Sequence, residues 1–164
     1  MSLERLWAGW RAEYVGSVGA EDDRTECLFC ALAAAPDDEA QIVARGADVY
    51  AVLNAYPYTS GHLMVAPVAH EPDFERLAPR VANALTEMTQ HAVVAIKAAY
   101  EPDGLNVGMN LGRAAGAGVP GHLHVHVLPR WVGDTNFMTT AAEVRVLPET
   151  LATTLDRLRG GWPA

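Results

Sequence analysis

Apolar and polar residues change their spacing along the chain, and these changes mark successive structural elements. Two runs rich in valine, leucine and tyrosine, 48–56 and 61–68, are separated by PYTS, a turn-forming sequence, so they predict a β-hairpin. From Pro79 to Tyr100 the apolar residues recur at steps of three and four. This spacing predicts an amphipathic helix of about five to six turns.

Shorter stretches complete the predicted order of elements. They are a short helix at 27–34, a polar connection at 36–40, a strand at 105–111, a glycine-rich connection at 112–121, a last core strand at 122–129 and a short helix within 147–160. Strands in hairpins around one long helix predict an α+β fold with a mostly antiparallel sheet of about five strands.

Composition narrows the class of protein. The 164 residues suit one domain, and half of them are apolar. The formal net charge of −8 argues against a nucleic acid polymer or a membrane surface as partner, although a small phosphate ligand needs only local positive potential. No apolar run reaches the roughly 18 residues of a membrane span, and the charged start is unlike a signal peptide. We therefore expect a cytoplasmic protein.

Three histidines, His122, His124 and His126, alternate with apolar residues near the end of the glycine-rich connection. Side chains alternate between the faces of a strand, so the three imidazoles are expected on one open face and Leu123 and Val125 on the core face. A solvated polar face is the plain alternative, but threonine, lysine or glutamate would be more usual there. A metal site and a phosphate-transfer site both fit the pattern, and spacing alone does not choose between them.

Polar residues elsewhere favour a phosphate ligand. Asn54 precedes His62 by eight positions, and Asn110 precedes the glycine-rich connection, which contains Arg113. Glycines let backbone amides approach an anion closely, and an arginine can pair with phosphate. The candidate glycines are Gly116 and Gly118. A glycine-rich loop alone is more often a plain connection, whereas this ordered set is more specific.

The motif HLHVHVL resembles the signature of the histidine triad superfamily of nucleotide hydrolases and transferases, and the likeness extends from about residue 6 to 147. The segments LERLWAGWRAEYV, YAVLNAYPYTSGHLMVAP and HLHVHVLPRWVGDTNF are most similar to its bacterial diadenosine tetraphosphate phosphorylase branch. One departure is GAGVPG before the triad, which lacks the amide and hydroxyl typical of the phosphoramidase and triphosphate hydrolase branches and is one residue longer.

The resemblance implies roles for individual residues. His124 corresponds to the nucleophile that forms a nucleotidyl-histidine intermediate, and His126 corresponds to the contact on the phosphate and leaving-group side. His62 matches a histidine near the α-phosphate. Asn54 matches the residue that grips the ribose hydroxyls, and Asn110 the amide that contacts phosphate.

The two cysteines, Cys27 and Cys30, are spaced C-x2-C. Incidental thiols are one interpretation, and a thioredoxin-like redox pair is disfavoured because no βαβ pattern surrounds them. A structural zinc site is preferred, with His70 as a candidate third ligand. The resemblance implies that His122 is the fourth, so we expect one zinc per chain.

The expected protein is one domain over 1–164, with an arm at 1–20, a core at about 21–147 and a tail at about 148–164. Its expected activity is cleavage of dinucleoside polyphosphates, with phosphorolysis favoured over hydrolysis. A dinucleoside polyphosphate hydrolase, a nucleoside phosphoramidase and a non-catalytic nucleotide-binding module are the alternatives. The family resemblance implies a homodimer. Trp131 is expected either in the nucleotide pocket or at a dimer seam, and 133–137 is expected to close over the site.

Overall fold

The computed structural model describes residues 27–134 and 149–163. The secondary-structure elements follow one another in this order: α2 (Leu28–Ala34), α3 (Asp37–Ala40), β1 (Ile42–Arg45), β2 (Val49–Leu53), β3 (Leu63–Pro67), η1 (Phe74–Arg76), α4 (Pro79–Tyr100), β4 (Gly104–Met109), η2 (Arg113–Ala115), β5 (Val125–Arg130) and α6 (Leu151–Gly160). The predicted arm at 1–20 lies outside the described residues. No helix in the described ranges is both long enough and apolar enough to cross a membrane.

The five strands form one antiparallel sheet in the order β1-β2-β3-β5-β4. The predicted hairpin is present as β2 and β3, which pair from Val49 opposite Pro67 to Leu53 opposite Leu63. Strand β5 lies between β3 and β4, with His126 opposite Met64 on one side and Gly108 on the other. The last predicted core strand is therefore central, and it brings the histidine segment beside β3.

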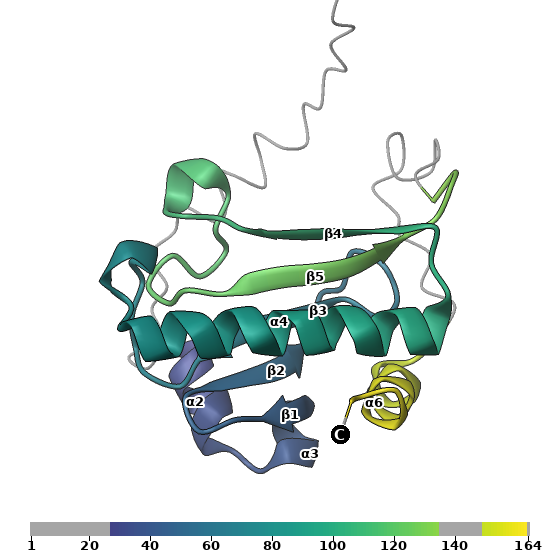
Figure 1. The fold of residues 1–164 in the computed structure, drawn as a ribbon, viewed down its shortest axis with the longest axis horizontal. Helices are drawn as coiled ribbons and strands as arrows, with labels where there is room; N and C mark the ends of the chain where they lie inside the picture. The colour runs from purple at the N-terminus through teal and green to yellow at the C-terminus, as the bar shows by residue number, and fades with distance from the viewer. Residues whose placement is uncertain (1–26, 135–148, 164) are drawn as a thin grey trace, which may run out of the picture.

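Both faces of the sheet are covered over β2 and β3, which explains why these two strands are buried at every position. Helices α4 and α6 pack against one face and share a core with Leu63, Val65 and Val127. A second core on the opposite face contains Phe29 of α2, and the strand residues alternate between the two cores as a pleated sheet requires. Figure 1 shows α4 lying along the sheet, with α6 near the end of that helix.

Helix α4 begins and ends where the sequence predicts. Pro79 occupies its first turn, where a missing backbone N–H costs no intrahelical hydrogen bond. Glu101 ends the helix in the left-handed conformation, and its N–H donates to the Lys97 carbonyl. The buried stripe of α4 faces the sheet and consists of Leu85, Met88, Ala92, Ala95 and Ile96.

Three sequence-based expectations are corrected by the structure. The polar connection at 36–40 contains the short helix α3, and β1, which was not predicted, follows it. Strand β5 begins at Val125 rather than at His122, because the N–H groups of His122 and Leu123 bond to the Val119 and Glu71 carbonyls instead of a neighbouring strand. The histidine face is also not open, since His122 is 1% and His124 5% exposed beneath α2.

Candidate functional site

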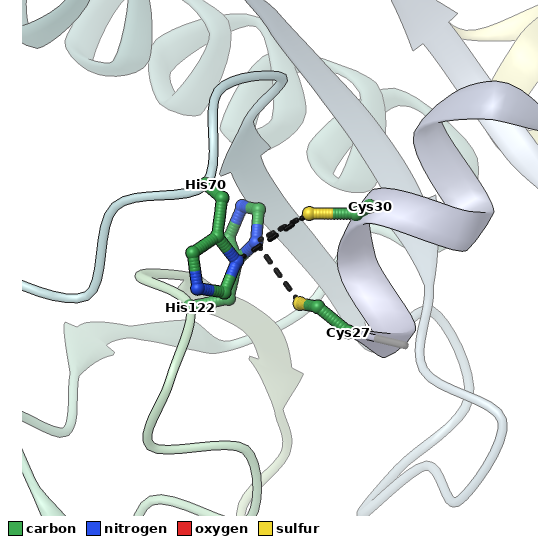
Figure 2. Close-up of side chains that lie close together, drawn as sticks. All are labelled: Cys27, Cys30, His70 and His122. Atoms are coloured by element: carbon green, nitrogen blue, oxygen red, sulfur yellow. Dashed lines mark hydrogen bonds between the residues drawn. The ribbon is translucent and has the colours of Figure 1, made fainter. Parts of the chain in front are cut away.

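Four side chains from three separate segments meet at one end of the histidine segment. Cys27 and Cys30 lie at the start of α2, His70 follows β3, and His122 precedes β5. One ligand atom from each of the four lies within 4.8 Å of the others. Figure 2 shows the two sulfurs and the two imidazole rings turned toward a common point.

The separations between these atoms fit a tetrahedral metal. The Cys27 sulfur is 3.3 Å and the Cys30 sulfur 3.7 Å from His122 Nδ1, and the Cys30 sulfur is 3.4 Å from His70 Nδ1. Tetrahedral zinc with sulfur and nitrogen ligands places its ligand atoms roughly 3.3 to 3.8 Å apart. Two thiolates and two imidazoles are also a donor set that zinc prefers, and four protein ligands leave no open position.

A backbone carbonyl orients the His122 ring. His122 Nε2–H donates to the Pro67 carbonyl at 2.9 Å, so the lone pair lies on Nδ1, the nitrogen that faces the cysteines. Metal-bound histidines usually donate their other N–H in this way. Burial lowers the pKa of His122, and the nearby His70 lowers it further, which keeps the ring in its neutral, metal-binding form.

His124 has the opposite arrangement. Its Nδ1 lies 2.9 Å from the His122 carbonyl, and because a carbonyl only accepts, Nδ1 carries the proton. The lone pair of the neutral ring is then on Nε2. Burial lowers the pKa of His124 below the usual histidine value, so the ring is neutral at pH 7. Its Nε2 is therefore suited to nucleophilic attack.

His62 and His126 form a hydrogen-bonded pair, with His62 Nε2 at 2.9 Å from His126 Nδ1. The Tyr58 backbone N–H donates to His62 Nδ1 at 3.1 Å, so the proton of a neutral His62 lies on Nε2. His62 then donates to His126 Nδ1, and a neutral His126 carries its own proton on Nε2. Burial, reinforced by His124, lowers the pKa of His126 to about 4, so this ring is neutral at pH 7.

Phe29 joins the cysteine pair to the candidate nucleophile. It lies between Cys27 and Cys30 in the sequence, is 1% exposed, and stacks on the His124 ring with centroids 4.7 Å apart. Tyr50 of β2 donates its hydroxyl to the Phe29 carbonyl at 2.7 Å. The cysteine-bearing helix therefore covers the face of His124.

A side-chain hydrogen bond from Asn110 stabilises the glycine-rich connection. Asn110 Nδ2 donates to the Gly116 carbonyl at 3.3 Å, and Gly116 has a φ of 90°, which favours glycine. Arg113 at the start of η2 is exposed, as is Gly118. The structure therefore places Asn110 against the loop itself, with Arg113 and Gly118 facing solvent.

The tryptophan after the histidine segment packs beside α4. The Trp131 and Tyr100 rings meet edge-on with centroids 6.4 Å apart, and Trp131 N–H donates to Asp134. This contact is with the α4 end rather than with the histidine rings. Most of the 133–137 segment expected to close over the site lies outside the described residues.

Three contributors were missed by the sequence-based interpretation. Phe29 could have been suspected, because its position between two metal-ligand candidates places its ring near the cluster. The Pro67 carbonyl and the Tyr58 N–H have no such signal, since backbone groups occur in every residue and act here only through their position.

Comparison with known proteins points to one family. Residues 35–132 match the family model described as HIT domain. The chain is 41% identical to an AP-4-A phosphorylase of Mycobacterium tuberculosis, over 98% of this chain and 85% of that protein. It is also 32% identical to an uncharacterized HIT-like protein of Saccharolobus solfataricus, over 68% of this chain and 79% of that protein.

Solved structures give the same result. A zinc-bound histidine triad family protein from Mycobacterium smegmatis superposes with a TM-score of 0.68 at 28% identity, covering 83% of this chain and 92% of that one. A hypothetical histidine triad nucleotide-binding protein from Sulfolobus tokodaii has a TM-score of 0.67 at 28% identity, covering 82% of this chain and 91% of that one.

Proposed function

The chain belongs to the HIT domain family, and from that premise we propose that it is a nucleotidyl-transfer enzyme that cleaves dinucleoside polyphosphates such as diadenosine tetraphosphate. The similarity to an AP-4-A phosphorylase over nearly the whole chain supports an enzyme of this type. The substrate itself, the covalent route and the preference for phosphate as acceptor are parts of the proposal.

One observation carries the mechanism: the two histidines that follow His122 present opposite forms of Nε2. His124 has a lone pair there, because its Nδ1–H is held by the His122 carbonyl. His126 has a proton there, because its Nδ1 accepts from His62. A nucleophile and a hydrogen-bond donor therefore lie side by side, with ring centroids 4.9 Å apart.

The proposed reaction has two displacements. His124 Nε2 attacks the α-phosphorus, an N–P bond forms, and the bond to the bridging oxygen breaks with its electron pair leaving on the departing nucleotide. The His126 Nε2–H donates to that departing oxygen, and the His122 carbonyl stabilises the positive charge that develops on the His124 ring. Orthophosphate then attacks the same phosphorus, the N–P bond breaks with its electron pair returning to His124 Nε2, and a nucleoside diphosphate is released.

We assign the remaining predicted site residues to nucleotide binding. Asn54 is assigned to the ribose, while Asn110, Arg113 and the amides near Gly116 and Gly118 are assigned to the phosphates. These residues carry no proton-transfer role in the scheme. Arg113 lies in the glycine-rich connection and is exposed, so its guanidinium is available to pair with a polyphosphate.

Zinc has a structural role in this proposal. The donor set and separations of Cys27, Cys30, His70 and His122 fit one zinc ion, which would supply a cross-link between α2, the segment after β3 and the histidine segment. The residues that carry the reaction are His62, His124 and His126. The proposal also includes one domain over 1–164, a cytoplasmic location and a homodimer.

The decisive experiment incubates the protein with diadenosine tetraphosphate in the presence and absence of orthophosphate and separates the products. Phosphate-dependent formation of ADP and ATP is the expected result. AMP and ATP without a phosphate requirement would indicate a hydrolase instead. Binding of the dinucleotide without any product would indicate a nucleotide-binding module and overturn the proposal.

A further inference from the structure

Asn54 lies at the end of β2, and both ends of its side-chain amide are used within the protein. Its Oδ1 accepts the N–H of Tyr56 at 2.9 Å, and its Nδ2 lies 3.3 Å from His62 Nδ1. Because a backbone N–H can only donate, it requires the oxygen of the amide on its side. The NH2 group is therefore the end that faces His62.

Two donors thus meet at one ring nitrogen. The Tyr58 N–H and the Asn54 amide both point at His62 Nδ1, at 3.1 and 3.3 Å. A proton on that nitrogen would face two other protons, so the neutral ring carries its proton on Nε2 instead. His62 is 1% exposed, so water does not compete readily for these positions.

The tautomer of His62 determines the tautomer of His126. His62 Nε2–H donates to His126 Nδ1 at 2.9 Å, and the proton of the neutral His126 is left on Nε2. We propose that Asn54 is a positioning residue that acts through His62: together with the Tyr58 N–H it holds the tautomer of both rings, in addition to any contact with the ribose. The kinetic part of this inference rests on the proposed nucleotidyl transfer, whereas the tautomers do not.

The test compares Asn54→Asp with Asn54→Ala. Aspartate keeps an oxygen for the Tyr56 N–H and for a ribose hydroxyl, but it turns a carboxylate toward His62 Nδ1. That carboxylate favours a proton on Nδ1, and this proton would face the Tyr58 N–H, so the ring orientation in which Nε2–H donates to His126 is destabilised. Alanine only removes one of two donors and leaves the other in place.

The first readout is the ring-nitrogen NMR spectrum of 15N-histidine-labelled protein near pH 7. In the wild type we expect Nδ1 of both His62 and His126 to be unprotonated and both Nε2 atoms to be protonated. Asn54→Asp should give His62 a protonated Nδ1, whereas Asn54→Ala should keep the wild-type pattern. Asn83→Asp, an exposed residue on α4, makes the same chemical change away from the site and should alter neither ring.

The second readout is steady-state kinetics with diadenosine tetraphosphate and phosphate. We expect kcat to fall about tenfold to a hundredfold in Asn54→Asp and less in Asn54→Ala, with KM changed less than kcat. A role confined to the ribose predicts the reverse order, with alanine worse than aspartate and the loss in KM.

The outcomes distinguish failure of the positioning role from failure of the proposed function. Wild-type ring signals in Asn54→Asp, or a loss confined to KM, would overturn the positioning role while leaving the proposed function intact. The predicted ring signals in a protein that does not turn over the dinucleotide would support the tautomer assignment and overturn the proposed function.

Discussion

The two ends of the histidine segment use the same residue type for different chemistry. We call His122 the metal end, and His124 and His126 the reacting end. His122 turns Nδ1 toward two sulfurs and donates Nε2–H to the Pro67 carbonyl, whereas His124 donates Nδ1–H to the His122 carbonyl and keeps its lone pair on Nε2. Both rings are buried and have a lowered pKa. The comparison shows that the position of one backbone carbonyl decides whether a histidine in this segment is suited to hold a metal or to attack a phosphate.

The largest effect is expected where the reacting end loses its nucleophile. His124→Ala should lower turnover by roughly four orders of magnitude or more, because the covalent route has no second attacking group. Zinc content and nucleotide binding should stay near wild type, since the metal end is untouched. His91→Ala on α4 is the histidine control. Substantial turnover by His124→Ala, measured by product chromatography, would remove this residue from the mechanism.

The next largest effect is expected at the metal end. Cys30→Ser should release zinc and lower Tm by roughly 5 to 10 °C, because a closed tetrahedral site loses a ligand and its cross-link. Metal analysis and thermal unfolding measure the two changes. Adding Cys27→Ser to this variant should change Tm little further, since the site is already lost. A wild-type protein that contains no zinc after mild purification would contradict the assignment.

A smaller effect should appear where the two ends meet. Phe29→Leu removes the ring that stacks on His124 at 4.7 Å but keeps an apolar side chain between the cysteines. We expect kcat to fall about tenfold, which corresponds to the energy of one well-packed aromatic contact, with zinc content unchanged. Phe74→Leu, at a 44% exposed position, is the matched control and should change neither quantity. If Phe29→Leu loses zinc as well, the two ends are less separable than proposed.

The last prediction concerns pH. Burial and the neighbouring His124 lower the pKa of His126 to about 4, below the ordinary histidine value. The unfolded chain then binds a proton at higher pH than the native protein does, so the free energy of unfolding should fall as pH decreases from about 6.5 toward 4. NMR titration of the His126 ring measures its pKa in the native protein directly. A ring that titrates near its unfolded value would contradict the lowered pKa of His126.

Sequence patterns anticipated the parts of the fold that depend on side-chain type. The alternation of Leu123, Val125 and Val127 correctly identified the core face of the histidine segment, and α4 runs from Pro79 to Tyr100 as its periodicity predicts. Strand β1 was missed because four residues give little periodicity. Its pairing with β2 is also irregular, with a register shift between Ile42 and Ala44.

For the candidate site, the sequence likewise identified the residue types but not the orientation of their side chains. Histidines and cysteines are visible by type, and the structure brings the four proposed metal ligands together. The tautomers could not be predicted, because they depend on the Pro67 and His122 carbonyls and on the Tyr58 N–H. The burial of His124 beneath Phe29 likewise depends on how α2 packs, and no local pattern reports it.

The pairing of β3 with β5 also bears on the order in which the protein acquires its site during folding. His62 and His126 are 64 positions apart, and the whole of α4 lies between them. Helical contacts are local and form early, whereas closing such a long loop is slow. After dilution from denaturant, helical circular dichroism should therefore recover before the His62–His126 hydrogen bond, and enzymatic competence should be among the last properties to return.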